Sequence, residues 1–151
     1  MTHRVLVHLI AASVLAVPLS VPLSAADPEG FALWTNAQLK AFDKSQSLGD
    51  FKNHTAQMNH REKNGEVEVH ANFTDVFVVQ SGEASLMIGG TVLNGKSTAP
   101  GEIRGTTATG AEKHALHPGD IVHIPAGVPH QVILEPGKTI TYFAVKIPKA
   151  T

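Results

Sequence analysis

The sequence contains no cysteine among its 151 residues. Disulfide bonds, thiolate metal ligands, cysteine catalysis and thiol-based redox switching are therefore excluded. The stability of the folded chain must come from side-chain packing, strand pairing, association between subunits or a bound metal.

The sequence also lacks an excess of charge of either sign. Twelve Lys and Arg residues stand against 13 Asp and Glu residues, for a formal net charge of −1. Nucleic acids and anionic membranes attract proteins that carry a basic surplus. We therefore expect a small-molecule ligand or substrate as the partner and no nucleic acid.

Long hydrophobic runs are confined to the N-terminus. Arg4 precedes the apolar stretch Val5–Val17, and the small residues Ser24 and Ala26 follow two prolines. This order is typical of a secretory signal peptide, here residues 1–26, and the run is shorter than the ~20 residues of a membrane-spanning helix. We expect an exported protein, periplasmic or secreted, without a membrane partner after cleavage.

The remaining chain is the length of one domain, and its pattern changes once. Residues 27–53 form an expected N-terminal helical segment, in which Trp34–Gly49 predicts a helix with Thr35 and Gln38 as a capping box. Residues 54–151 show period-two alternation in short runs separated by Gly and Pro, which predicts an all-β sandwich or barrel. We expect tight hairpins at Gly82–Glu83 and at Gly89–Gly90.

A group of metal-binding residue types stands out within the β-rich part. Glu68 and His70 are two residues apart, so one strand places both on the same face. Asp75 begins the next predicted strand, and His130 follows a Pro/Gly turn. Imidazole and carboxylate ligands suit divalent Fe, Mn, Ni, Zn or Cu. The alternative is that Glu68 and His70 form the solvated face of a half-exposed strand.

Two sequence motifs resemble those of the cupin superfamily. In "VEVHANFTDVFVVQSG", Glu68 and His70 occupy the family's His-x-His positions, Asp75 the Glu position and Gly82 the Gly position. "GDIVHIPAGVPH" is similar to the second motif and ends at His130, although the family's final Asn is replaced by a leucine.

The resemblance implies a jelly-roll β-barrel of two antiparallel sheets, with the one predicted helix preceding it, and a homodimer. It implies a divalent metal held by Glu68, His70, Asp75 and His130. Glu68 stands where the family has His, and Asp75 is one methylene shorter than Glu, so Asp75 could stand outside the set of ligands.

Further polar residues are candidates for the same site. Glu68 and His123 are the candidate catalytic groups for proton transfer, although a histidine at such a strand position is more often an ordinary one that bonds to a backbone partner. We interpret Lys146 as a solvated surface residue. The stretch Asn94–Thr107 between the two motifs predicts an extra hairpin or flap. Weaker candidates for lining the substrate site are Asn72, Gln80, Arg104 and Tyr142.

The resemblance favours a metal-dependent enzyme that acts on a small organic substrate, as an oxygenase, a lyase or an isomerase. A barrel that binds a small ligand or a carbohydrate without chemistry is the alternative, and a storage barrel is the third interpretation. Metal analysis of the purified protein separates them, because the enzyme hypothesis requires a bound transition metal.

Overall fold

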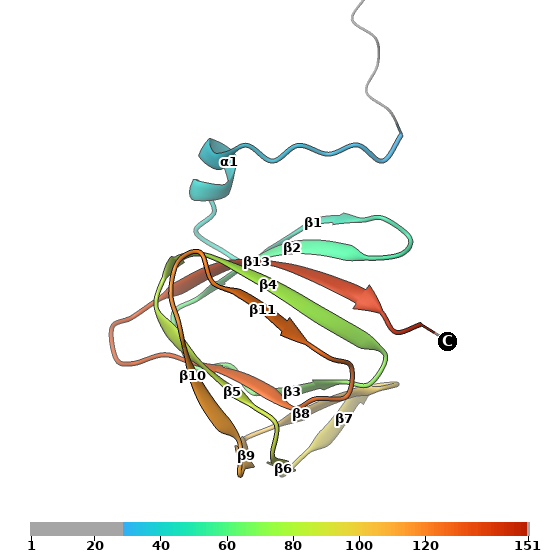
Figure 1. The fold of residues 1–151 in the computed structure, drawn as a ribbon, viewed down its shortest axis with the longest axis vertical. Coiled ribbons are helices and arrows are strands. Elements are labelled where there is room, and N and C mark those ends of the chain that lie inside the picture. The colour runs from blue at the N-terminus through green and yellow to red at the C-terminus, as the bar shows by residue number, and fades with distance from the viewer. Residues whose placement is uncertain (1–28, 151) are drawn as a thin grey trace, which may run out of the picture. The chain divides into compact units, whose positions relative to one another are not determined.

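The computed structural model describes residues 29–150, which contain thirteen strands and one short helix (Figure 1). The predicted signal peptide lies outside the described residues. The strands form two main antiparallel sheets that face each other, so the predicted all-β jelly roll is confirmed.

The first sheet has five strands. Their order across the sheet is β1 (Gln46–Asp50), β2 (Thr55–Arg61), β13 (Ile140–Pro148), β4 (Phe73–Gly82) and β11 (Ile121–Ile124). The two longest strands, β4 and β13, pair along most of their length at its centre. This sheet lies above the second one in Figure 1.

The second sheet has six strands, and a small two-stranded ribbon accompanies it. The order of the six is β10 (Glu112–Leu116), β5 (Ala84–Ile88), β12 (His130–Ile133), β3 (Val67–His70), β8 (Glu102–Gly105) and β7 (Lys96–Ala99). The ribbon pairs β6 (Thr91–Leu93) with β9 (Thr107–Thr109).

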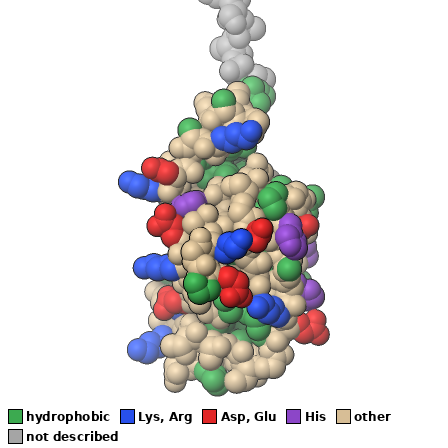
Figure 2. Space-filling view, turned by 90° about the vertical axis from the view of Figure 1, so that its left-hand side faces the viewer, with side chains coloured by type: hydrophobic (Ala, Val, Ile, Leu, Met, Phe, Trp, Pro, Cys, Tyr) green, Lys and Arg blue, Asp and Glu red, His purple; other side chains and the backbone are tan. Residues whose placement is uncertain are grey.

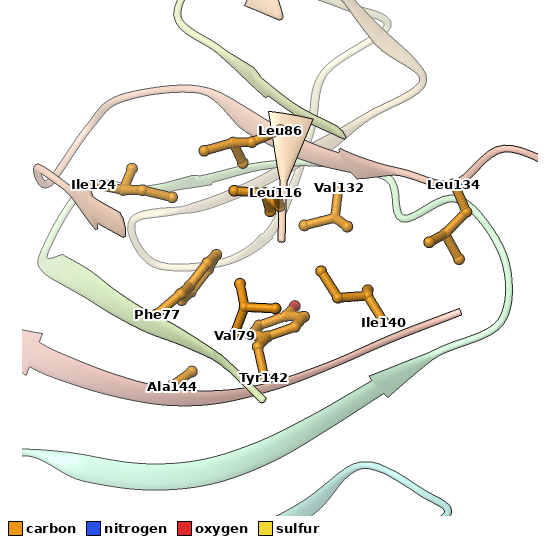
Figure 3. Packing of buried hydrophobic residues seen from close by; sticks show 10 residues of the cluster. All are labelled: Phe77, Val79, Leu86, Leu116, Ile124, Val132, Leu134, Ile140, Tyr142 and Ala144. Carbon is orange, nitrogen blue, oxygen red and sulfur yellow. The ribbon is translucent and has the colours of Figure 1, made fainter. Parts of the chain in front are cut away.

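The hydrophobic core lies between the two sheets (Figure 3). Alternation along β4 and β13 sends every second side chain inward, as period two requires. In β4 this inward row is Asp75, Phe77 and Val79, all of them buried. The row therefore runs from an apolar core into a buried carboxylate, which places a polar site at one end of the core.

The predicted helix is much shorter than expected. Helix α1 covers only Asn36–Lys40, and the predicted capping box between Thr35 and Gln38 is present. The prediction of helix up to Gly49 was wrong, because Gln46–Asp50 pairs with β2 as the edge strand β1. Pairing with a neighbouring strand overrode a helix preference that only local residues supported.

Both predicted hairpins were also wrong. At Gly82 the chain crosses from one sheet to the other, since β4 pairs with β13 and β11 whereas β5 pairs with β10 and β12. After Gly89–Gly90 the chain enters β6, whose partner is β9. Glycine marks a sharp change of direction in both places, but a change of sheet uses the same residue type as a hairpin.

The stretch Asn94–Thr107 holds the strands β7 and β8, which pair with each other, as the predicted hairpin requires. Strand β8 also pairs with β3, the strand that carries Glu68 and His70. The inserted hairpin thus extends the second sheet beside the candidate ligands, at the lower right of Figure 1.

The surface is of mixed charge on the face shown in Figure 2, where Lys and Arg side chains alternate with Asp and Glu. None of the helical structure between residues 29 and 150 has the length and apolarity needed to cross a bilayer.

Candidate metal centre

The candidate ligands come from three strands that meet at one end of the core. Glu68 and His70 lie on β3, and His130 on β12 is directly opposite Glu68. Asp75 ends the inward row of β4 on the facing sheet. His70, Asp75 and His130 are each only 4% exposed. Residues 62 positions apart in the sequence are thus brought to one point by strand register.

The side-chain atoms of these residues converge closely enough to share one ion. Ligating atoms of Glu68, His70 and His130 all lie within 4.8 Å of one another. His70 Nε2 is 3.3 Å from Glu68 Oε2, and it is 3.4 Å from Asp75 Oδ2. His130 Nε2 is 3.6 Å from the same Asp75 oxygen. Two nitrogens and two carboxylate oxygens therefore surround a common space.

Both imidazoles are oriented to present Nε2 to that space. Nδ1 of His130 is 3.1 Å from the carbonyl oxygen of Val128, which can only accept, so Nδ1 carries the proton. Nδ1 of His70 is hydrogen-bonded to the carboxylate of Glu102. Among the described residues, the two Nε2 atoms are the buried side-chain polar atoms that have no hydrogen-bond partner.

Buried polar atoms without a partner are rare, and each one needs a physical reason. Two imidazole nitrogens aimed at each other and at two carboxylate oxygens fit the ligand chemistry of a divalent transition metal. Hydrogen bonds from the opposite ring nitrogens are the usual support of metal-binding histidines. The residues present therefore fit a metal ion, with Glu68, His70 and His130 as the three-residue candidate site.

Each carboxylate turns one oxygen toward the histidines and the other toward a cation. Glu68 Oε1 lies 3.5 Å from Arg61 Nη2, and it lies 3.9 Å from Arg104 Nε. Asp75 Oδ1 lies 3.0 Å from Lys146 Nζ. The cations thereby fix which oxygen of each carboxylate points at the common space.

Titration behaviour reflects these contacts. Burial alone would raise the pKa of Glu68, but contact with His70 and the charges of Arg104 and Arg61 outweigh burial and lower the pKa to about 2. Burial would likewise lower the pKa of His70, and contacts with carboxylates, Glu68 foremost, raise it instead. Burial dominates at His130 and lowers its pKa. Glu68 is therefore ionised and His130 neutral at neutral pH.

A cavity of about 220 Å³ opens beside the candidate ligands. Glu68, His70 and Asp75 form part of its wall. Its other lining residues are Gln57, Asn59, Arg61, Phe77, Arg104, Tyr142, Ala144 and Lys146. A larger hollow of about 690 Å³ is lined by Arg61, Asp43 and Asn64 among others, but the candidate ligands do not line it. The smaller cavity is therefore the one that can hold a substrate of this centre.

Tyr142 projects into this cavity from β13. Its hydroxyl oxygen accepts a hydrogen bond from Arg61 Nε at 3.0 Å, and its ring packs on Phe77 (Figure 3). Burial raises the pKa of Tyr142, and the negative charges of Glu68 and Asp75 add to that effect. The phenol therefore keeps its proton at neutral pH.

The structure places the candidate catalytic residue His123 and the weaker lining candidates in different regions. Arg104 and Tyr142 line the cavity beside the candidate ligands. His123 lines a separate groove of about 540 Å³ with Ile121 and Val122. Asn72 and Gln80 are exposed, Asn72 next to Gly101 and Gln80 in a hollow under α1. Strand register brings the first two to the centre and leaves the other three outside this cavity.

Sequence reasoning missed three charged residues of the site, namely Arg61, Glu102 and Lys146. Lys146 is directly opposite Asp75 and half-buried, so its interpretation as a solvated surface residue was wrong. The inward row through Tyr142 and Ala144 includes Lys146, and continuing that period-two row would have found it. Glu102 could be found only from the pairing of β8 with β3.

The family model described as "JmjC domain" matches residues 35–150. No curated protein matches the chain. Among solved structures, a protein from Bacillus halodurans superposes with a TM-score of 0.61 at 13% identity, covering 84% of this chain and 89% of that one. A cupin protein from Bacteroides fragilis has a TM-score of 0.55 at 15% identity, covering 82% and 89%.

The DMSP lyase DddQ from Ruegeria pomeroyi superposes with a TM-score of 0.50 at 15% identity, covering 68% of this chain and 45% of that one. Similarity at these identities concerns the fold. Together with the family match, it confirms the fold superfamily that the two sequence motifs predicted.

Proposed function

We propose that this chain, which belongs to the JmjC domain family, is a metal-dependent enzyme that acts on a small organic acid. One observation carries the proposal: two buried histidine Nε2 atoms without hydrogen-bond partners among the described residues face two carboxylate oxygens beside a cavity. A barrel with only a storage or structural role offers no physical reason for two buried polar atoms without hydrogen-bond partners. Glu68, His70, Asp75 and His130 would hold the ion.

The size of the cavity supports a compact substrate. Cavities that hold drug-sized ligands measure about 300–1,000 Å³. The cavity beside the candidate ligands measures about 220 Å³ and is polar on several sides, with Gln57, Asn59 and Tyr142 in its wall. A substrate of a few non-hydrogen atoms with several oxygen functions fits this space best.

The charges around the cavity support an acidic substrate. Three cations, Arg61, Arg104 and Lys146, line it. Three carboxylates, those of Glu68, Asp75 and Glu102, contact these cations. The positive and negative charges of these six side chains balance, so a bound divalent ion would give the cavity an excess of positive charge. A negatively charged ligand would compensate that excess, and arginine is well suited to bind a carboxylate.

The residues of the chain can be assigned separate tasks in such a reaction. A divalent ion bound to the four ligands would act as a Lewis acid toward an oxygen of the substrate. Arg61 holds the Tyr142 hydroxyl by its oxygen, which leaves the phenolic proton free to be donated to a substrate atom. Phe77 and Ala144 form the apolar part of the wall, which excludes water from that side.

The proposal includes the location of the protein and its association into a dimer. The N-terminal pattern of residues 1–26 supports export to the periplasm or the exterior. Exposed edge strands of the two sheets, such as β11 and β10, support association into a homodimer.

The test begins with metal content. The protein is purified without an affinity tag and analysed for transition metals, and an equivalent close to one per chain is expected. The metal-loaded protein is then incubated with a panel of small carboxylic acids and followed by NMR. Conversion by the native protein but not by His130→Ala supports the proposal. Binding without conversion would instead identify a ligand-binding barrel, and absence of metal uptake would overturn the metal-dependent enzyme.

A further inference from the structure

We propose that Glu102, on the inserted β7–β8 hairpin, is the positioning residue that makes His70 a metal ligand, and that Arg104 holds Glu102 in place. The inference rests on the proposed function, because it assumes that an ion binds at the centre. It assigns a task to a segment that contributes no ligand itself.

The pairing of β3 with β8 sets four residues of each strand opposite each other, and two of these pairs join ionisable side chains. His70 is directly opposite Glu102, and Glu68 is directly opposite Arg104. Residues that face each other across antiparallel strands have side chains on the same face and close together. The sequence Glu-x-His of β3 therefore meets Glu-x-Arg of β8 with each carboxylate beside a cation or an imidazole.

One oxygen of Glu102 accepts from two donors. Oε2 of Glu102 accepts from His70 Nδ1, and Arg104 Nη1 donates to the same oxygen at 3.1 Å. The Arg104 side chain also lies near Glu68, so it is held between the two carboxylates. This arrangement fixes the rotamer of Glu102 and keeps its carboxylate on the side of His70 away from the common space.

The hydrogen bond decides which nitrogen of His70 is available. A carboxylate accepts and does not donate, so Nδ1 must carry the proton, and the neutral ring then has its lone pair on Nε2. Without Glu102, the ring could place its proton on Nε2, where it would block a metal. Supporting carboxylates of this kind typically contribute about 10- to 100-fold in metal affinity.

The second histidine is fixed by a different kind of group. His130 Nδ1 is held by the backbone carbonyl of Val128, in the loop that belongs to the second motif. That support is present whatever side chain the loop carries. His70 depends on a side chain from the insertion, so the affinity of the centre depends on a segment outside both motifs.

The test measures metal affinity by competition with a chelator. Glu102→Gln, which keeps the size of the side chain but removes its charge, and Glu102→Ala are compared with the native protein. The matched control is Glu112→Gln, since Glu112 on β10 also lies beside a histidine, 3.5 Å from His114 Nε2, but is 81% exposed in its side chain. We expect Glu102→Ala to weaken affinity by about 10- to 100-fold, Glu102→Gln by less, and Glu112→Gln not at all.

A second readout needs no metal. Nitrogen NMR of the metal-free protein reports which ring nitrogen of His70 carries the proton, and a merely structural role of Glu102 would not change it. We expect the proton on Nδ1 in the native protein and a shift toward Nε2 in Glu102→Ala. Native affinity in a Glu102→Ala variant that folds, or an Nε2 proton in the native metal-free protein at a pH where the ring is neutral, would overturn the inference. A native protein that binds no metal would overturn the proposed function as well.

Discussion

His70 and Glu102 are 32 positions apart in the sequence, yet they stand opposite each other on β3 and β8 and share a hydrogen bond. This pair joins the first motif to the insertion between the two motifs. The candidate centre therefore consists of the ligands and of a supporting strand, and the predictions below address both, together with the fold that holds them.

Replacing His130 by alanine should abolish stable metal binding. His130 Nε2 is one of the two buried nitrogens that face the carboxylates, and losing a ligand should cost more than the about 10- to 100-fold cost of losing a supporting partner. Metal content after dialysis measures the effect, and His114→Ala, at an exposed position on β10, is the control. Full metal content in the His130 variant would refute the assignment.

Asp75→Asn should weaken metal binding strongly, and Lys146→Met should partly restore it in the double variant. The substitution at Asp75 removes a charge that faces both histidines and leaves the Lys146 ammonium, 3.0 Å away, without its partner beside the ion. The metal affinities of the native protein, the two single variants and the double variant form a cycle, which gives the coupling between Asp75 and Lys146. A double variant that binds no better than Asp75→Asn would show that the lysine charge does not act on the ion.

Metal affinity should fall as the pH is lowered, beginning above pH 6.5. An ion binds the deprotonated imidazole, and the pKa of His70 is raised above the ordinary histidine value of 6.5 because contacts with carboxylates, Glu68 foremost, outweigh burial. Protons therefore compete below that raised pKa, and the affinity levels off above it. Each displaced proton contributes about tenfold per pH unit. Chelator competition between about pH 5.5 and about pH 8.5 tests this, and a constant affinity over the range would contradict it.

Ile140→Ala should destabilise the fold by about 2–5 kcal/mol. Ile140 is 0% exposed and lies in the core where β13 pairs with both β2 and β4. Ile147→Ala, in the same strand but at a position 40% exposed, is the matched control and should cost less than about 1 kcal/mol. Denaturant unfolding measures both, and equal losses would show that the core is placed wrongly.

Gly82→Ala should cost more stability than Gly137→Ala, although both glycines have a positive φ, +79° and +76°. The left-handed backbone conformation penalises alanine by about 1–2 kcal/mol at both positions. At Gly82 a Cβ would also lie 2.0 Å from the backbone oxygen of Thr139, whereas at Gly137 it would meet nothing within 4 Å. Thermal unfolding of the two variants compares them, and similar midpoints would contradict the close approach at the sheet crossing.

Much of the fold was readable from the sequence. Period-two alternation located β2, β3, β4 and β5, and the two motifs identified the superfamily to which their arrangement belongs. Hairpins were predicted where the chain changes sheet, because Gly82 and Gly89–Gly90 signal a turn without saying which strand follows as a partner. Partner choice depends on contacts far apart in the sequence, and local residues do not encode them.

The candidate ligands could be predicted from the sequence, but the charged residues that support them could not all be predicted. His70 and His130 follow from motif positions, and the structure brings them together with Glu68 and Asp75. Arg61 and Glu102 could not be assigned, because charged strand residues usually face solvent and only strand pairing places Arg61 in the cavity wall and Glu102 beside His70. Lys146 follows from the inward row through Tyr142 and Ala144. Export and association into a homodimer stay predictions.

The position of β8 at the border of the second sheet, with only β7 beyond it, makes the supporting strand separable from the barrel that carries the ligands. The hairpin is therefore an exchangeable segment. Its length and the side chains of Glu102 and Arg104 can be changed without altering either motif. Metal affinity in this scaffold should then be tunable by exchange of the hairpin, with every coordinating residue unchanged.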